Sequence, residues 1–316
     1  MKNYSQEKKV LIIKFGGLGD VILSLNAINS IIEHHKKRKI TLLTEEPYKT
    51  FFEKSGWFND IVEIERTKFY MFDRYQIKKR LSVNSFSNVY DLQTSRRSSS
   101  YLKIFFNLKI ETCGIGQYAS LCHVNNSRNK MHTIERQEDQ LRVSGITSFL
   151  EPDLKWLFKA GRIKKPKKRY ALIVPGGSKG RMNKRVPLQI YLELISFLEK
   201  KNILPVILGA NDDQIICDKI ELQCPKVKNL CSKTDIFQIA KLAKNALVSF
   251  GNDTGPMHVI SKGDRPTFVF FTKFSEPKLC APRGNNVRLF YYNEQYRKEM
   301  LFNILKELGN VTNAKT

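Results

Sequence analysis

The sequence predicts an α/β protein made of two tandem Rossmann-like domains with a cleft between them. Short runs of β-branched residues alternate with longer amphipathic stretches, which is the pattern of parallel βαβ units. The pattern occurs before a basic stretch at residues 162–169 and starts again after it. A chain of 316 residues, 41% of them hydrophobic, is also long enough for two domains with separate cores.

The first half of the chain has the elements of one doubly wound parallel sheet. Residues 9–15 (KVLIIKF) are typical of a buried strand, and the amphipathic residues 20–35 are typical of a helix. The other elements expected here are strands at 39–44, 60–64 and 89–93 and a helix that begins at a proline over 47–55. Residues 1–161 are therefore predicted to form the first domain.

The second half repeats this order of elements after residues 162–169, which have the composition of an extended basic linker. Its expected elements are strands at 170–174, 203–208, 227–230, 246–250 and 266–271 and helices at 187–200, 212–223 and 294–308. Residues 170–316 are therefore predicted to form the second domain, and its last helix packs either there or back on the first domain. Open parallel sheets bind ligands at the carboxyl ends of their strands, so the loops at these ends are expected to carry the chemistry.

The chain has a formal net charge of +24, which suggests a nucleic acid, an anionic membrane surface or a phosphorylated or acidic small molecule as partner. Ten Lys and Arg residues lie between positions 162 and 185, in a linker and a loop, and no known nucleic-acid-binding module is visible. We therefore expect no nucleic-acid partner. The sequence has neither a signal peptide nor an apolar run long enough to span a bilayer, which predicts a cytoplasmic protein.

A glycine-rich loop with the sequence GGLGD follows the first predicted strand, at residues 16–20. The start of the helix after it offers free N–H groups to an anion or a polar ligand. A dinucleotide-binding motif fits badly because Ile22 stands where glycine or alanine is needed, although Glu45 or Glu46 suits a ribose contact. Asp20 either caps the helix or acts as a general base toward a hydroxyl nucleophile.

Two loops of the second half have the composition of a phosphate site. The strand at 170–174 runs into PGGS and then into KGRMNKR at 179–185, so that glycines, a hydroxyl and cations follow a strand. The segment GNDTGPMH at 251–258 leads from another strand into a helix. A flexible surface loop for the first and a packing role for His258 are the alternatives. No D-x-D pair follows a predicted strand, so cations of the protein rather than a metal ion are expected to balance a diphosphate.

Several of these motifs together carry a resemblance to a known family. They are KVLIIKFGGLGDVILSLNAI at the start of the chain, PGGS…NKRVP in the middle, and GNDTGPMHVISKGDRPTFVFF followed by Pro277 and Pro282. The combination resembles glycosyltransferase family nine, the ADP-heptose:lipopolysaccharide heptosyltransferases. The resemblance implies a glycosyltransferase B-type fold in which the first domain binds the acceptor and the second binds the nucleotide-sugar.

The resemblance also implies roles for individual residues. Asp20 is the implied catalytic base of an inverting, metal-independent transfer, and Lys184 is implied to contact the donor phosphates. The full set of implied donor-binding residues is Ser178, Lys184, Asp213, Asp253, Thr254, Gly255 and His258. For the acceptor we expect contacts from Gly17 and Gly19 of the glycine-rich loop and from the cations Arg96 and Arg97, for which ordinary surface positions are the alternative.

Two positions differ from the family pattern and bear on the donor. Val186 stands where tryptophan is common, and Asp212 or Asp213 stands where a glutamate contacts the nucleotide. The expected donor is ADP-heptose, with another nucleotide-sugar as the alternative and a nicotinamide-dependent oxidoreductase as the less favoured reading. The expected acceptor is an anionic lipid-linked oligosaccharide of the lipopolysaccharide inner core, with another cell-surface glycan as the alternative. No cofactor is expected, and the enzyme is placed at the inner face of the inner membrane, in contact with anionic lipid.

Overall fold

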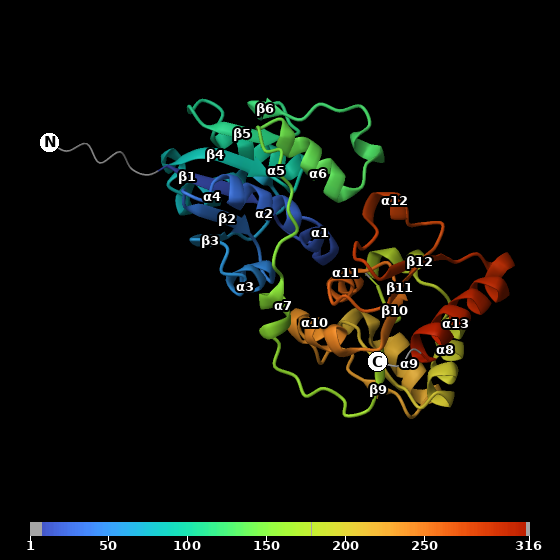
Figure 1. Ribbon diagram of the computed structural model, residues 1–316. Helices are drawn as coiled ribbons and strands as arrows, with labels where there is room; N and C mark the ends of the chain where they lie inside the picture. The colour runs from blue at the N-terminus through green and yellow to red at the C-terminus, as the bar shows by residue number, and fades with distance from the viewer. Residues whose placement is uncertain (1–7, 178, 314–316) are drawn as a thin grey trace. The chain divides into compact units, whose positions relative to one another are not determined.

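The computed structural model describes residues 8–177 and 179–313, which belong to two compact units, Met1–Asp153 and Leu154–Thr316. Each unit contains one parallel sheet with helices on its faces (Figure 1). Residues 154–161, which the sequence assigned to the first domain, are part of the second unit. There α7 (Lys155–Lys159) packs on α10 (Ile236–Asn245), and the ring centroids of Trp156 and Phe237 are 6.3 Å apart.

Both sheets have six strands in the Rossmann order. The order is β3-β2-β1-β4-β5-β6 in the first unit and β12-β11-β10-β7-β8-β9 in the second. Counted from the first strand of each unit, both orders are 3-2-1-4-5-6, as in dinucleotide-binding domains. The predicted fold class is confirmed. In each sheet, strands one to three are added toward one edge and strands four to six toward the other. The order therefore switches between the adjacent first and fourth strands, and such folds bind their ligands at this switch point.

The first unit alternates short strands with helices along most of its length. Its strands are β1 (Lys9–Ile13), β2 (Ile40–Thr44), β3 (Asp60–Glu63), β4 (Phe86–Asp91), β5 (Glu111–Gly114) and β6 (Leu121–Cys122). Its α-helices are α1 (Leu18–Leu23), α2 (Leu25–His34), α3 (Tyr48–Glu53), α4 (Tyr70–Arg80), α5 (Arg96–Tyr101) and α6 (Thr133–Arg142).

The second unit repeats the alternation. Its strands are β7 (Tyr170–Val174), β8 (Leu204–Ile207), β9 (Lys228–Asn229), β10 (Val248–Asn252), β11 (Thr267–Phe271) and β12 (Val287–Tyr291). In addition to α7 and α10, its α-helices are α8 (Leu188–Lys200), α9 (Gln214–Gln223), α11 (Gly255–Ser261), α12 (Pro277–Cys280) and α13 (Arg297–Asn313).

The helix expected over residues 20–35 is divided into α1 and α2 at Ser24. The Ser24 hydroxyl donates to the carbonyl of Asp20 at 2.6 Å, and its backbone N–H donates to the same oxygen at 3.1 Å. A serine that bonds back to the preceding turn favours a bend in a helix. The division therefore makes α1, which carries Asp20, a separate short element.

Several elements had no clear signal in the sequence. Helix α6 buries Thr133, Gln137, Gln140 and Leu141, so most of its buried positions are polar and no apolar period marks it. The Gln140 amide donates to the backbone carbonyl of Asp91 at 2.9 Å. Strands β5, β6 and β12 and helix α4 were also not expected; β5 and β6 are short, with four and two residues.

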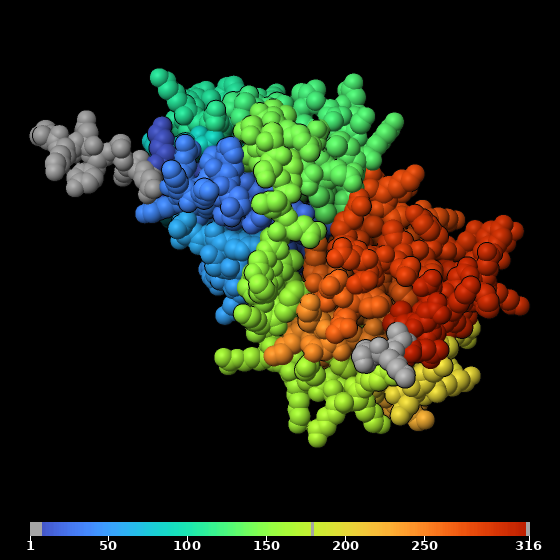
Figure 2. Space-filling model, in the orientation of Figure 1, coloured from blue at the N-terminus to red at the C-terminus, as the bar shows by residue number. Residues whose placement is uncertain are grey.

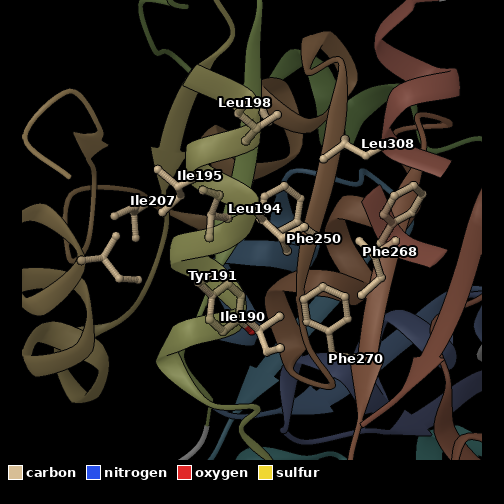
Figure 3. Close-up of a cluster of buried hydrophobic side chains, with 14 of the residues drawn as sticks. Ile190, Tyr191, Leu194, Ile195, Leu198, Ile207, Phe250, Phe268, Phe270 and Leu308 are labelled. Atoms are coloured by element: carbon tan, nitrogen blue, oxygen red, sulfur yellow. The ribbon is translucent and has the colours of Figure 1, made fainter. Parts of the chain in front are cut away.

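The core of the second unit lies between α8, the sheet and the last helix (Figure 3). The last helix was expected to pack either on the second domain or back on the first. In the structure α13 packs against α8 and β12 of its own unit. The buried side chains labelled in Figure 3 are Ile190, Tyr191, Leu194, Ile195, Leu198, Ile207, Phe250, Phe268, Phe270 and Leu308.

The basic segment at 162–169 joins α7 to β7 without forming a helix or strand, and most of its side chains are exposed. Figure 2 shows this yellow-green stretch of chain at the surface. In the part of the chain that the structure describes, no helix is both long and apolar enough to cross a bilayer.

Candidate active site

The glycine-rich loop after β1 is held by side chains from two neighbouring strand ends. The Gly16 N–H donates to Glu45 Oε1 at 3.0 Å, and Gln93 Nε2 donates to the Gly16 carbonyl at 3.2 Å. Gln93 Oε1 also accepts the Phe15 N–H at 3.1 Å. A Cβ at Gly16 would lie 2.6 Å from the Tyr48 ring, so this position admits only glycine without rearrangement.

Asp20 is in the first turn of α1, with an exposed side chain. Gly17, also exposed, is the residue before the helix, and Gly19 is inside it. The backbone under Asp20 is fixed through Ser24, whose hydroxyl accepts from the Gln137 amide of α6 at 2.8 Å. The structure therefore presents the Asp20 carboxylate to solvent from a turn that Ser24 and Gln137 support.

Two buried ionisable side chains, Lys14 and Asp91, lie at the ends of the paired strands β1 and β4. Asp91, at the end of β4, is fully buried and accepts the N–H groups of Gln93 and Thr94 and the hydroxyl of Ser98. Burial raises the pKa of Asp91 from 3.8 to about 6, although these hydrogen bonds and Lys14 act in the opposite direction. Burial lowers the pKa of Lys14, at the end of β1, to about 8, against the attraction of Asp20 and Asp91.

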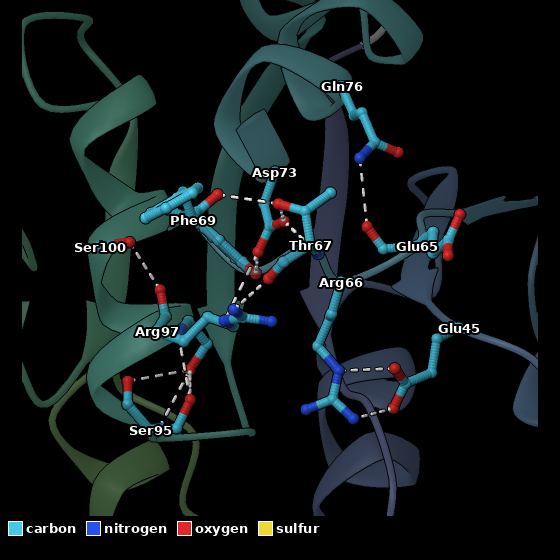
Figure 4. Close-up of polar contacts among 12 residues, drawn as sticks. Glu45, Glu65, Arg66, Thr67, Phe69, Asp73, Gln76, Ser95, Arg97 and Ser100 are labelled. Carbon is cyan, nitrogen blue, oxygen red and sulfur yellow. Dashed lines mark hydrogen bonds and ion pairs between the residues drawn. The ribbon is translucent and has the colours of Figure 1, made fainter. Parts of the chain in front are cut away.

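A pocket of about 510 Å³ opens beside the loop in the same unit. Arg66 forms a bidentate ion pair with Glu45, with both contacts at 2.5 Å, and Arg97 lies 3.5 Å from the buried carboxylate of Asp73 (Figure 4). Arg97 also donates to the Thr67 carbonyl. The residues that line the pocket are Glu45, Glu46, Glu63, Ile64, Glu65, Arg66 and Arg97.

Of the two arginines predicted to bind an acceptor, Arg97 therefore lines a pocket, whereas Arg96 is an exposed residue at the start of α5. For Glu45 the sequence suggested a ribose contact. The structure instead engages both of its oxygens with Arg66 and one of them with the Gly16 N–H, so this carboxylate is part of the loop's support.

In the second unit, Asn252 joins the loops after β7 and β10. Its amide nitrogen donates to the carbonyls of Pro175 and Gly176 at 2.7 and 3.1 Å, and its oxygen accepts the Val186 N–H at 3.0 Å. Asn252 is buried and all its partners are backbone groups, so it fixes the position of both loops. Val186, where the family commonly has tryptophan, is buried in the core of this unit.

The predicted donor residues Lys184 and Asp253 form an ion pair. Lys184 Nζ is 2.8 Å from Asp253 Oδ2, and the same oxygen accepts the Ser275 hydroxyl. His258 Nε2, on α11, lies 4.0 Å from the other Asp253 oxygen. A pocket of about 340 Å³ adjoins the pair and is lined by Gly180, Arg181, Asn183, Lys184, Phe274, Ser275, Glu276, Leu279 and Cys280.

Asp213 supports the loop after β7. Its Oδ1 accepts the Gly177 N–H and the Arg185 guanidinium, both at 2.9 Å, and its Oδ2 accepts the Ala210 N–H at 3.0 Å. A Cβ at Gly176 would come within 2.1 Å of Asp213 Oδ1, so the carboxylate occupies the space that the glycine leaves. The neighbouring Asp212 is exposed.

Two further predicted donor residues, Thr254 and Gly255, begin α11, with Thr254 in extended backbone conformation just before the helix. Ser178 lies outside the described residues. The structure thus brings Lys184, Asp253 and His258 together, and holds Asp213 in a separate cluster with Arg185.

Comparison with known proteins places this arrangement in a family. The model of glycosyltransferase family 9 (heptosyltransferase) matches residues 74–301, well over half of the chain. The chain belongs to glycosyltransferase family 9. It is 24% identical over 270 residues to lipooligosaccharide heptosyltransferase 2 of Campylobacter jejuni, an alignment that covers 82% of this chain and 80% of that protein.

Solved structures of family 9 proteins share the fold. ADP-heptose LPS heptosyltransferase II of Escherichia coli matches with a TM-score of 0.73 at 17% identity, over 96% of this chain and 98% of that one. The family 9 glycosyltransferase of Veillonella parvula matches with a TM-score of 0.77 at 15% identity, over 98% of both chains. The predicted glycosyltransferase B-type fold and the assignment as an enzyme of this family are confirmed.

Some residues that build this family 9 site were not singled out from the sequence. Asn252 and Gln93 had a signal, because each is a polar residue at or just after the end of a buried strand. Arg66 and Ser275 had none, because their roles depend on partners far away in sequence, Glu45 and Asp253.

Proposed function

We propose that this family 9 enzyme is an inverting, metal-independent glycosyltransferase that moves heptose from ADP-heptose to the inner core of lipopolysaccharide. The observation that supports this most is that Asp20 and Lys184 belong to the loops after β1 and β7, the strands at which the two sheet orders reverse. Rossmann-like sheets bind ligands at these loops. Asp20 supplies a base for the attacking hydroxyl, and Lys184 supplies a cation for the leaving diphosphate.

In the proposed reaction, the Asp20 carboxylate accepts the proton of an acceptor hydroxyl as that oxygen forms a bond to the anomeric carbon of heptose. The bond from this carbon to the diphosphate oxygen breaks, and its electron pair leaves with ADP. Attack from the face opposite the diphosphate inverts the configuration. Lys184 stabilises the negative charge that grows on the leaving diphosphate.

The contacts of Lys184 support its role toward the donor. Its ion pair with Asp253 holds the ammonium at the edge of the 340 Å³ pocket, where Arg181 supplies a second cation. In the proposed complex Lys184 contacts the diphosphate. Asp253, His258, Thr254 and Gly255 line the nucleotide-sugar beside it. The name of the E. coli relative, an ADP-heptose heptosyltransferase, supports the same donor.

The first unit supplies the proposed acceptor site. The pocket lined by Arg97 and Arg66 lies beside the loop of Asp20, to which it is joined through Glu45. In the proposed complex the Arg97 guanidinium, in a pocket whose lining also holds four glutamates, contacts the anionic sugar, and Arg96 adds an exposed cation at the start of α5. We propose that Gly17 and Gly19 give the acceptor access to Asp20, and that the acceptor is a Kdo-bearing, lipid-linked oligosaccharide at the cytoplasmic face of the inner membrane.

Turnover with defined substrates tests this function. Incubation with ADP-heptose and Kdo-lipid A is expected to release ADP and to add the mass of one heptose to the acceptor, as measured by a coupled ADP assay and mass spectrometry. An acceptor that already carries inner-core heptose is assayed in parallel, because the C. jejuni relative is named as a second heptosyltransferase. Absence of product with every inner-core acceptor would overturn the assignment.

A different nucleotide-sugar is the second candidate, and one observation favours it. Asp213, which stands near the family's nucleotide-contacting glutamate, already has both oxygens engaged by Arg185 and by two backbone N–H groups. Thermal-shift titrations with ADP-, UDP- and GDP-sugars separate the two donors. Stabilisation by ADP-heptose alone supports the main proposal, and stabilisation by another sugar nucleotide replaces it.

A further inference from the structure

Helix α4 and the residue before it expose an unusual number of large apolar side chains. Phe69, Met71, Phe72 and Tyr75 are 58%, 58%, 53% and 67% exposed. They lie within seven consecutive residues of the first unit, whereas most other exposed apolar side chains are scattered singly. Single exposed apolar residues need no explanation, but a contiguous group of this kind marks a contact surface.

The outward direction of these side chains is fixed by the buried side of α4. Asp73 and Ile77 are fully buried, and the Asp73 carboxylate accepts the Tyr101 hydroxyl at 2.5 Å. It also accepts the Thr67 hydroxyl at 2.8 Å (Figure 4). At about 100° per residue, Met71 and Tyr75 point away from that buried side. The exposed aromatic face is therefore set by the fold and cannot turn inward without breaking the Asp73 contacts.

Cations surround the apolar group. Between positions 66 and 80 the only acidic residue is the buried Asp73. Lys78 and Lys79 are exposed on the last turn of α4, and Lys68 is exposed before the helix. We call Phe69, Met71, Phe72, Tyr75 and the cations Lys68, Lys78 and Lys79 the α4 surface. Aromatic rings favour the headgroup region of a bilayer and lysines are attracted to its anionic lipids, so exposed aromatic residues and lysines without an exposed carboxylate within residues 66–80 suit an anionic membrane surface.

The α4 surface adjoins the proposed acceptor pocket. The Arg97 guanidinium, which lines the 510 Å³ pocket, stacks 4.7 Å from the ring centroid of Tyr70 on α4. Arg97 also bonds to the carbonyl of Thr67, two residues before Phe69. A surface that entered the headgroup region at α4 would therefore bring the pocket close to headgroup level.

We propose that the α4 surface docks the enzyme on an anionic lipid bilayer, with Phe69, Met71, Phe72 and Tyr75 among the headgroups and Lys68, Lys78 and Lys79 on the lipid phosphates. This inference rests on the proposed function in one respect, since a lipid-linked acceptor gives the docking its purpose. The contact itself depends only on the exposed side chains and their charge.

Co-sedimentation of the full-length protein with vesicles, without donor or acceptor, tests the docking. The wild type is expected to bind vesicles of phosphatidylethanolamine and phosphatidylglycerol, to bind pure phosphatidylcholine much more weakly, and to dissociate as salt rises. Phe72→Ser/Tyr75→Ser and Lys78→Glu/Lys79→Glu are each expected to lower the partition coefficient by about tenfold or more, since each removes apolar burial or phosphate contacts.

Matched variants in the second unit control for changes in apolar area and charge. Leu222 and Phe302 are 83% and 66% exposed, and Lys226 and Lys228 are exposed. Leu222→Ser/Phe302→Ser and Lys226→Glu/Lys228→Glu are expected to bind vesicles as the wild type does. Equal loss in the control and α4 variants, or no binding by the wild type, overturns the proposal. Concentration-dependent self-association of the wild type that the α4 variants abolish, without vesicle binding, assigns the surface to a protein contact and also overturns it.

Activity on two acceptors separates this proposal from the proposed function. The α4 variants are expected to keep wild-type turnover on a water-soluble Kdo oligosaccharide and to lose it on Kdo-lipid A presented in anionic vesicles. If the wild type is inactive on both acceptors but still binds vesicles through α4, the substrate assignment is refuted and the docking proposal stands. Equal turnover by wild type and variants on vesicle-bound acceptor contradicts the docking and leaves the transferase assignment standing.

Discussion

Asp20 and Asp91 are carboxylates of the same unit in opposite surroundings. Asp20 is exposed in the first turn of α1, whereas Asp91 is fully buried at the end of β4 and accepts two backbone N–H groups and the hydroxyl of Ser98. An exposed carboxylate is free to take a proton from a substrate. A buried and fully bonded carboxylate supports the loop around it.

Replacing Asp20 with asparagine is expected to lower kcat by about 10²–10⁴-fold, because the amide keeps the shape of the side chain but cannot accept a proton as a base. Affinity for ADP, measured by calorimetry, is expected to stay at the wild-type value. The exposed Asp60→Asn, in the same unit, is the control and should retain wild-type kcat. An unchanged kcat in Asp20→Asn would contradict the proposed role.

Asp91 is expected to make stability depend on pH. Burial raises its pKa from 3.8 to about 6, so the contribution of the protonated form to stability is present below pH 3.8 and lost as pH rises through about 6. The shift corresponds to about 3 kcal/mol. The free energy of unfolding of the wild type should therefore fall between about pH 4 and about pH 7, whereas that of Asp91→Asn, which cannot ionise at this position, should not show this fall. Urea unfolding of both proteins across this pH range measures the difference. A constant difference across this range would refute the assignment of the pH dependence to Asp91.

At the scale of elements, the loops of the candidate active site are held by residues from neighbouring strand ends. Glu45 after β2 and Gln93 after β4 fix the loop after β1, and Asn252 of β10 fixes the loop after β7. Asp213 after β8 binds the same β7 loop through Gly177 and Arg185. Each loop is thus positioned by the strands on both sides of it, which reduces the freedom lost when a ligand binds.

The adjacent residues Asp212 and Asp213 test this support. Asp213→Asn breaks an ion pair whose side chains are 9% and 10% exposed, which is expected to cost about 3–5 kcal/mol. The midpoint of thermal unfolding should fall and the KM for donor should rise. Asp212→Asn, at an exposed position, is expected to change neither. Equal effects of the two substitutions would contradict the supporting role of Asp213.

At the scale of the whole molecule, each unit has its own six-stranded sheet and its own buried cluster. The cluster of the second unit includes Phe250, Phe268 and Phe270 from the sheet and Leu308 from the last helix. That of the first includes Leu11, Phe15, Leu43 and Tyr101. Separate cores predict that damage to one unit leaves the other folded.

Phe270→Ala tests this independence. Removal of a fully buried ring is expected to cost about 3–5 kcal/mol in the second unit. Hydrogen exchange followed by mass spectrometry should speed up in β7, β10 and β11 and stay unchanged in β1, β2 and β4. Exposed Phe302→Ala serves as the control and should alter neither unit. Uniformly faster exchange in both units would show that they unfold together.

The sequence by itself determined the fold class, the family and the loops that carry the candidate site. β1, β7, β10 and β11 are short runs rich in apolar residues, and this local pattern is visible without tertiary information. It also marked the loops of Asp20 and Asp253, since each follows such a strand, whereas Lys184 was implied by the resemblance to the family. The predicted roles of these residues, the domain functions and the interdomain cleft remain predictions.

Only the tertiary structure decided how those loops are held and which surfaces stay exposed. Glu45 meets Arg66 and Gly16, Asp253 meets Ser275, and Asp213 meets Gly177 across gaps of 21 to 36 residues. Helix α6 has polar buried positions because its glutamines bond to Ser24 and to the end of β4, so the apolar period that predicts helices is missing. Contacts of this kind depend on the parallel order of the strands, which brings distant residues to one edge of a sheet and which no local pattern contains.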